Sequence, residues 1–149
     1  REQGKIKEWG VSNITPSQLA LMETEGTPQW NQIECSLTHT APMLDGTLDF
    51  HQTRNIGTMA WSPLGRFFKE PGAVRDRLEP TIHRMLDKYA CTVECLLLAW
   101  LFRHPAAIIP VVGTTRVDRI QAMAKAHKIE LETEDWFALT EASWGYKVP

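Results

Sequence analysis

Residues 5–18 read KIKEWGVSNITPSQ, and in this stretch a strand pattern passes directly into the start of a helix. Residues 5–11 predict a short strand with alternating apolar members. The helix is expected to begin at the N-cap Thr15, with Pro16 as its first residue and Gln18 completing a capping box. A strand joined to a helix in this way is the repeating unit of an α/β fold.

The same alternation continues through the rest of the chain. Three more strands are predicted at residues 30–35, 58–61 and 108–112, and residues 66–75 have the composition of a loop. The remaining predicted helices cover residues 46–54, 77–89, 93–103, 115–126 and 133–144, with Thr115 as N-cap of the helix that it opens. Four strands separated by helices imply parallel pairing through right-handed crossovers. The predicted fold class is therefore α/β, and four such units make half of an eight-stranded (β/α)8 TIM barrel.

The composition is that of one soluble globular domain. The chain has 149 residues, of which 43% are hydrophobic and 23% are charged, and its formal net charge at pH 7 is −2. This balance gives no general attraction to nucleic acid, and no apolar run is long enough to span a membrane. Three cysteines without a second ligand cluster favour small core residues over disulfides or a metal site. A cytoplasmic location is expected.

The start of the chain suggests that residues 1–149 are an incomplete domain. The sequence opens with Arg1-Glu2-Gln3-Gly4, lacks an initiator Met and enters a strand pattern within a few residues. An isolated half barrel would have two unpaired strand edges and an exposed apolar inner face. We therefore expect the chain to require a missing N-terminal half-barrel, a second copy of itself, or a rearrangement.

Polar or small side chains follow every predicted strand. In barrels and open α/β sheets, ligands bind at the carboxyl ends of the strands. The residues at these ends are Ser12-Asn13, Gln32 with Glu34-Cys35, Trp61 to Gly65, and Gly113 to Arg116. Their hydrogen-bonding groups and glycines are what a polar ligand in contact with several loops would require.

Four segments at these strand ends resemble motifs of the aldo-keto reductase family in order and spacing. They read GKIKEWGVSN (4–13), NQIE (31–34), AWSPLG (60–65) and IPVVGTTR (109–116). The resemblance covers nearly the whole chain, and the closing GYKVP (145–149) suggests a bacterial-type branch. It implies the C-terminal half of a TIM barrel from an oxidoreductase that reduces a small aldehyde or ketone by hydride transfer from NADPH.

For the nicotinamide end of NADPH (or NADP+), the resemblance implies four contact residues. Ser12, Asn13 and Gln32 would hydrogen-bond the carboxamide, since their side chains offer paired donors and acceptors. Trp61 would stack on the ring. The plain alternatives are a turn before a helix for Ser12-Asn13, an ordinary polar strand residue for Gln32, and a core position for Trp61.

For the phosphates, the resemblance implies a loop and a helix start. Ser62-Pro63-Leu64-Gly65 would line the pyrophosphate, with the glycine allowing close backbone approach. Thr114, Arg116 and Arg119, preceded by Gly113, would bind the adenosine 2′-phosphate, which favours NADPH over NADH. The alternatives are a simple turn for the loop and a solvated charged helix surface for the arginines.

The resemblance also indicates what this chain lacks. In the family a Tyr donates the proton, a Lys and an Asp tune it, and a His orients the carbonyl, all from the first half of the barrel. Neither Tyr89 nor Tyr146 follows a strand, and His39 is the nearest histidine to a strand end. The other histidines are expected at the surface: His51, His83, His104 and His127. No catalytic residue is therefore assigned here, and the chain alone should show negligible turnover.

Two other interpretations of the chain remain open. The first is a non-catalytic nucleotide-binding module, which could form a full barrel as a dimer. The second is a truncated chain with no activity of its own. Binding of NADPH separates these two interpretations, because a chain without function would not bind the nucleotide.

Overall fold

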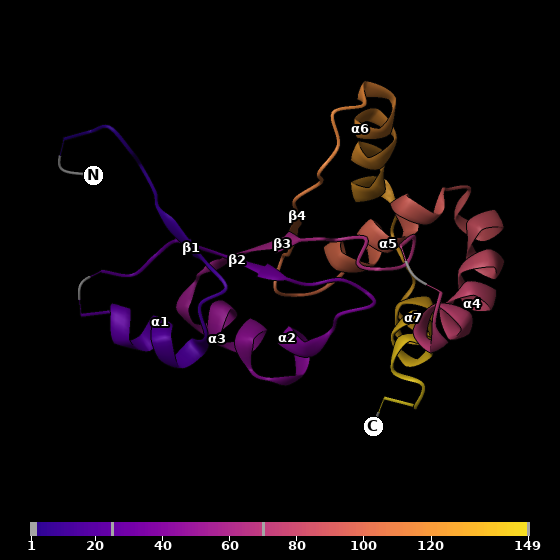
Figure 1. Ribbon diagram of the computed structural model, residues 1–149, viewed down its shortest axis with the longest axis horizontal. Helices are drawn as coiled ribbons and strands as arrows, with labels where there is room; N and C mark the ends of the chain where they lie inside the picture. Colours follow the sequence, from indigo (N-terminus) through magenta and orange to yellow (C-terminus); the bar gives the residue numbers. More distant parts are fainter. Residues whose placement is uncertain (1–2, 25, 70, 149) are drawn as a thin grey trace.

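Four parallel strands form a sheet in which each strand lies beside the next one along the chain (Figure 1). The computed structural model describes residues 3–24, 26–69 and 71–148. The strands are β1 (Gly10–Ser12), β2 (Trp30–Glu34), β3 (Gly57–Trp61) and β4 (Ile109–Pro110). All three pairings are parallel, which confirms the predicted α/β class with four parallel strands.

The helices fill the connections between the strands. They are α1 (Pro16–Met22), α2 (Ala41–Leu44), α3 (Thr47–Arg54), α4 (Ala73–Tyr89), α5 (Val93–Phe102), α6 (Val117–Ala124), the 3-10 helix η1 (Lys125–Lys128) and α7 (Thr133–Trp144). In Figure 1, α1 to α3 lie along one side of the sheet, whereas α4, α5 and α7 form a group beyond β3 and β4. The chain thus follows every strand with at least one helix.

Local capping fixes two of the helix starts. The Oγ1 of Thr15 accepts a hydrogen bond from the Gln18 backbone N–H, and the Thr15 N–H donates to Gln18 Oε1 at 2.9 Å. This is the capping box that the sequence predicts, and it satisfies two helix-terminal N–H groups. In the same way, Thr92 caps α5 by accepting from the Cys95 N–H.

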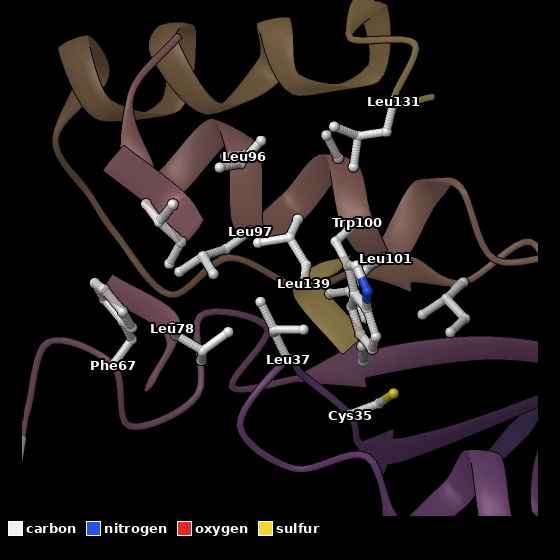
Figure 2. Packing of buried hydrophobic residues seen from close by; sticks show 14 of the residues in the cluster. Cys35, Leu37, Phe67, Leu78, Leu96, Leu97, Trp100, Leu101, Leu131 and Leu139 are labelled. Atoms are coloured by element: carbon white, nitrogen blue, oxygen red, sulfur yellow. The ribbon is translucent and has the colours of Figure 1, made fainter. Parts of the chain in front are cut away.

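α5 supplies the centre of the hydrophobic core. All residues from Cys95 to Leu101 are buried, because a helix that is apolar on all sides must be enclosed. Figure 2 shows Leu96, Leu97, Trp100 and Leu101 of this helix among buried side chains from other elements: Cys35, Leu37, Phe67, Leu78, Leu131 and Leu139. The core therefore lies on the helix side of the sheet and leaves the other face open.

Side chains of β2 alternate between these two faces. Asn31 and Ile33 are buried on the helix side, whereas Gln32 is only half-buried. Through the register of the sheet, Ile109 shares the face of Gln32, and it is 43% exposed. This confirms the prediction that the face turned away from the helices exposes apolar surface.

Two predicted strands are shorter than the sequence suggests. The strand expected at residues 5–11 is only Gly10–Ser12, because its partner β2 begins at Trp30, opposite Gly10. The strand expected at 108–112 is Ile109–Pro110, and the pairing ends there except for the Val111 N–H, which donates to the Ala60 carbonyl. Extended sequences form a ladder only where a neighbouring strand is present.

Two helix starts also differ from the predictions, and one short helix was not predicted. The segment 66–75, expected to be a loop, already contains the first turn of α4, which begins at Ala73. The N-cap of α6 is Arg116 rather than Thr115, and it has no side-chain capping bond. The short α2 at Ala41–Leu44 was not expected at all. One-turn elements leave little periodic signal in a sequence, and tertiary contacts decide them.

Candidate functional site

The carboxyl ends of β1 and β2 bring Ser12 and Gln32 side by side. The two residues are register partners in the sheet. The Ser12 hydroxyl donates to the Gln32 carbonyl at 3.1 Å, and the Asn13 N–H donates to the same oxygen at 2.9 Å. Because β1 ends at Ser12 and β2 ends two residues beyond Gln32, these polar side chains meet at one rim of the sheet.

Trp61 joins this rim from β3. It pairs in register with Glu34, and its indole N–H donates to the Asn13 Oδ1 at 2.9 Å. Asn13 has a φ of 56°, in the left-handed region that asparagine tolerates better than most residues. Residues that are far apart in sequence are thereby fixed to each other, and the flat Trp61 ring remains only partly buried.

A hollow of about 270 Å³ lies between these loops. Its lining includes Asn13 and Trp61 from the rim, and also Glu34, His39 and Asp45. His39, the histidine expected nearest a strand end, therefore does border the hollow. Glu34 is one of the strand-end residues that the sequence indicates, and it marks the end of β2, whereas Asp45 was not expected there.

The loop after β3, residues 62–65, packs against the connection that follows β2 and against the core. Gly65 has a φ of 57°, and a Cβ there would lie 2.0 Å from Thr38 Oγ1 and 2.6 Å from Ser36 Oγ. Pro63 is buried, and Leu64 packs against the core. The side chains of Pro63 and Leu64 therefore serve the fold, and a ligand along this loop would meet its backbone and Ser62.

A second hollow of about 220 Å³ adjoins this loop. It is lined by Thr38, Arg66 and Arg75, together with residues around the start of α4. Neither arginine was expected at the site, because residues 66–75 were predicted only as a loop, outside the four motifs. The first turn of α4 has no side-chain cap, and the hollow beside it is bordered by both arginines.

Gly113, Thr114 and Arg116 lie between β4 and α6, and Arg119 lies in the first turn of α6. The Arg116 guanidinium makes two hydrogen bonds to the Asp118 carboxylate, at 2.6 and 3.2 Å. That contact keeps the pKa of Asp118 below its usual range. Arg119 is 3.9 Å from Glu94. Both cations are exposed enough to reach a ligand, but each already has an acidic neighbour.

His51 is buried, and its predicted surface position is wrong. Its imidazole lies between β2 and β3, with Nε2 3.1 Å from Asn31 Nδ2 and Nδ1 2.8 Å from Thr58 Oγ1. Thr47, Leu48 and His51 form the buried face of α3, and this spacing is the signal in the sequence that would have placed the ring inside. Burial lowers the pKa of His51, against an opposing effect of Asp45.

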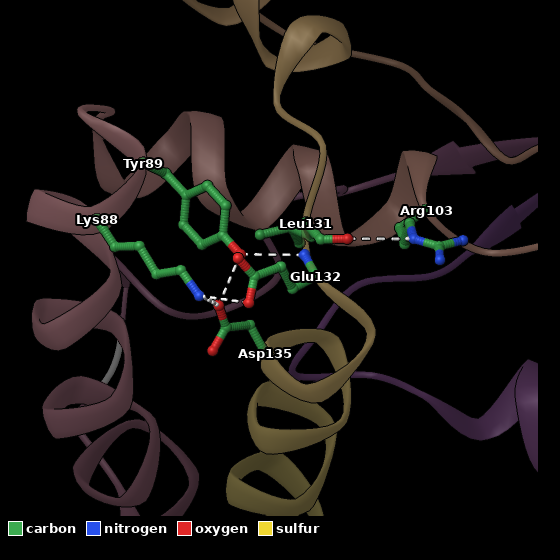
Figure 3. Close-up of polar contacts among 6 residues, drawn as sticks. All are labelled: Lys88, Tyr89, Arg103, Leu131, Glu132 and Asp135. Carbon is green, nitrogen blue, oxygen red and sulfur yellow. Dashed lines mark hydrogen bonds and ion pairs between the residues drawn. The ribbon is translucent and has the colours of Figure 1, made fainter.

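Tyr89 lies in a polar cluster between helices, away from the strand ends (Figure 3). Its hydroxyl donates to Asp135 Oδ2 at 2.6 Å and accepts from the Glu132 N–H at 3.0 Å. Lys88 bonds the carboxylates of both Glu132 and Asp135 at 2.7 Å. These contacts join α4 to α7, so this Tyr–Lys–Asp group has a structural position rather than one in the site.

Two negative findings hold for the described residues. Within 3–24, 26–69 and 71–148, there is no group of three or more His, Cys, Asp or Glu side chains suited to holding a metal ion. Across the same ranges, none of the helices has the length and apolar character needed to cross a membrane.

Comparison with known proteins gives consistent matches along the whole chain. A sequence model of the aldo/keto reductase family matches residues 1–143. Oxidoreductase YdhF of Escherichia coli is 34% identical over 154 residues, which covers 99% of this chain and 51% of that protein. A 6-dehydroglucose reductase of Agrobacterium fabrum is 34% identical, with coverage of 97% and 49%. The chain thus spans about half the length of the curated relatives that it matches.

Solved structures agree with these matches. The thermostable aldo-keto reductase Tm1743 superposes with a TM-score of 0.82 at 24% identity, over 95% of this chain and 50% of that one. The aldo-keto reductase AKR2E5 of the silkworm Bombyx mori, in its complex with NADPH, gives a TM-score of 0.79 at 25% identity. That match covers 98% of this chain and 45% of the silkworm chain. The four-stranded fold is therefore that of about half an aldo-keto reductase barrel.

Proposed function

This chain belongs to the aldo/keto reductase family, and on that premise we propose that it is the half of an oxidoreductase barrel that holds NADP+ or NADPH. The nicotinamide would lie at the carboxyl ends of β1, β2 and β3. The intact protein would reduce a small aldehyde or ketone, and this chain would form the nucleotide cradle and one wall of the substrate pocket.

The observation that supports this proposal is the meeting of four side chains at one rim. Ser12 and Gln32 are register partners, and Asn13 is hydrogen-bonded to Trp61. Together they offer a hydroxyl, two amides and a flat aromatic surface. These groups match a planar ring that carries a carboxamide, because the amides pair with its donor and acceptor while the indole covers a face of the ring.

The phosphate end of the site also fits a nucleotide in its chemistry. Arg116 and Arg119 lie at the start of α6, where helix N–H groups already favour anions. Their contacts to Asp118 and Glu94 involve exposed or half-exposed groups, and such pairs contribute little and exchange readily. A 2′-phosphate would therefore compete with these carboxylates for the guanidinium groups.

The reaction itself requires groups outside this chain. The bound cofactor would supply a hydride, and the developing alkoxide would need a proton donor within hydrogen-bond reach. Among the described tyrosines, Tyr89 is engaged between α4 and α7, and Tyr146 lies in the exposed tail. We therefore assign no catalytic residue here and infer that the Asp, Tyr, Lys and His of the family come from a preceding half-barrel.

A titration with NADPH tests the proposal directly. We expect NADPH to quench tryptophan fluorescence of the chain, and Trp61→Ala to weaken binding about tenfold, the scale of one lost aromatic stack. Trp144→Ala is the matched control. Trp144 is the last residue of α7, its indole N–H donates to Thr40, and it is not one of the four rim residues. Absence of binding, or equal losses in the two variants, would contradict the proposal.

Two further readouts separate the alternatives. Sedimentation of the chain with NADPH reports whether binding requires a dimer, the result expected for a self-sufficient nucleotide-binding module. Turnover of a simple aldehyde by the chain alone would contradict the assignment of the catalytic groups to another half-barrel.

A further inference from the structure

The buried ring of His51 lies directly behind the rim, on the helix side of the sheet. It comes from α3 and contacts β2 at Asn31 and β3 at Thr58. All three of these side chains are fully buried, with an exposed fraction of 0%. The described part of the chain leaves no buried side-chain nitrogen or oxygen without a partner, so every polar side-chain atom of this group takes part in a hydrogen bond.

The backbone of Ile14 fixes which way the amide of Asn31 points. The Asn31 Nδ2 is 2.8 Å from the Ile14 carbonyl oxygen and must donate to it. The Asn31 Oδ1 lies on the side of the Ile14 N–H, at 3.5 Å. The amide nitrogen therefore faces His51 as a donor, and Nε2 of the ring has to accept.

This direction determines the protonation of the ring. If Nε2 accepts from Asn31, the proton of the neutral imidazole is on Nδ1, where it donates to Thr58 Oγ1. A second proton on Nε2 would point at the Asn31 amino group. The structure thus requires a neutral ring with its hydrogen on Nδ1, in agreement with the burial that lowers the pKa of His51.

The same hydrogen bonds lead to the rim. Ile14 follows Asn13, whose left-handed backbone turns the chain out of β1. The Asn13 side chain in turn accepts from the Trp61 indole N–H. From His51, a continuous path of contacts passes through Asn31 and the Ile14 backbone to the turn that carries Asn13.

We propose that His51 is a positioning residue that holds the Ser12-Asn13 turn in place for the nicotinamide through Asn31. His51 touches no cofactor and acts by presenting an acceptor that locks the Asn31 amide. The proposal rests on the proposed function for its effect on NADPH binding, whereas its effect on the geometry of the turn does not depend on any ligand.

A pair of amide substitutions distinguishes this role from simple packing. His51→Gln can place an acceptor where Nε2 lies, and so can keep the bond from Asn31. His51→Asn is shorter, reaches the position of Nδ1 and keeps only the contact with Thr58. Positioning through Asn31 predicts that Gln substitutes for His and Asn does not, whereas packing alone predicts a stability loss that follows side-chain volume and leaves the Trp61 indole signal in place.

The readouts are the NMR signal of the Trp61 indole N–H and the affinity for NADPH. We expect His51→Gln to leave the indole signal near its wild-type position and affinity within about threefold. We expect His51→Asn to move the signal and weaken NADPH binding about tenfold, the scale of one hydrogen bond. Equal behaviour of the two variants would overturn the proposal. A moved indole signal with no NADPH binding by any variant would support positioning and reject the proposed function.

The wild-type chain provides a test that needs no variant. The nitrogen shifts of the His51 ring are expected to report the neutral form with hydrogen on Nδ1 at pH 7. A ring protonated on Nε2, in either the neutral or the charged form, could not accept from Asn31. That result would overturn the proposal even if the substituted proteins failed to fold.

Discussion

At the scale of single residues, the absence of a side chain at Gly65 determines the path of the loop after β3. The backbone there has a φ of 57°, and the Ser36 and Thr38 hydroxyls occupy the space that a Cβ would need. The Arg66 N–H also donates to Thr38 Oγ1 at 3.0 Å. The loop that is proposed to line the pyrophosphate is therefore fixed against the β2–α2 connection.

We predict that Gly65→Ala destabilises the chain by roughly 2–4 kcal/mol, since a left-handed alanine costs about 1 kcal/mol and the overlap with Thr38 adds about 1–3 kcal/mol. Gly46→Ala is the matched control. Gly46 also has a positive φ, of 84°, but nothing lies within 4 Å of its missing Cβ. Urea unfolding of both variants measures the difference, and equal losses would show that the close contact has no effect.

The charge of Arg119 is predicted to distinguish NADPH from NADH. Arg119→Ala should weaken NADPH binding by about tenfold to a hundredfold, the range of a charge-assisted contact to phosphate, and should leave NADH nearly unchanged. Arg103→Ala is a suitable control, because Arg103 lies at the end of α5, outside the start of α6, and bonds the Leu131 carbonyl. Titration with both nucleotides measures how much the affinity for NADPH and for NADH falls in each variant. Equal weakening for the two nucleotides would contradict a 2′-phosphate contact.

The sequence indicated some of these residues and missed others for identifiable reasons. Ser12, Asn13, Gln32 and Trp61 were predicted to lie together because polar residues that end parallel strands share one rim, and the structure brings them together. His51 was misplaced because a histidine in a helix has no intrinsic preference for the surface, and only its spacing from the buried Thr47 and Leu48 indicates burial. No sequence pattern could show its hydrogen bond to Asn31.

At the scale of elements, polar contacts join α4 and α7 at both ends. Arg77 of α4 donates to the Ala142 and Ser143 carbonyls near the end of α7, and a second group lies at the start of α7 (Figure 3). Tyr89 and Lys88 meet Asp135 and Glu132 at the start of α7. Burial raises the pKa of Asp135, but the hydrogen bonds from Lys88 and Tyr89 outweigh burial and hold that pKa below its usual range. The ionised carboxylate is therefore the form that stabilises this contact.

We predict that Tyr89→Phe costs about 1 kcal/mol at pH 7, because the Glu132 N–H and Asp135 both lose a partner. The unfolded Asp135 takes up its proton at a higher pH than the folded one. The contribution of ionised Asp135 to the free energy of unfolding is thus complete above the unfolded pKa of about 3.9, and it is lost as the pH falls through the folded pKa. Denaturant unfolding from pH 7 to pH 3 measures the effect. The free energy of unfolding should fall less steeply with acid for Tyr89→Phe, whereas Tyr146→Phe, in the exposed tail, should follow the wild type.

Element boundaries were predictable where local chemistry sets them. The capping box at Thr15 and the end of α3 at Asn55 depend on nearby residues, and both were found. The lengths of β1 and β4 depend on which residues of the neighbouring strand lie opposite, and the sequence of one strand does not contain that information.

At the scale of the whole molecule, both edges of the sheet are unpaired within the described residues. β1 pairs only with β2, and β4 pairs only with β3. Large apolar side chains are exposed at or near β4, including Ile109, Val111 and Val112. Open edges and apolar surface favour association, so we infer that a preceding half-barrel or a second copy of this chain covers them.

The order of the strands has a consequence for exchange of backbone hydrogens with deuterium. β2 and β3 have a strand on each side, whereas the amides of β1 that point away from β2 are shielded only when another strand docks. β4 has no such amide, because the Val111 N–H donates inward to Ala60 and the outward position is Pro110, which lacks an N–H. We expect slow exchange in the middle of the sheet and fast exchange at the outward amides of β1, which should slow when the completing half is added. Uniformly slow exchange in the chain alone would mean that copies of the chain already shield one another, and the deuterium pattern would map where they meet.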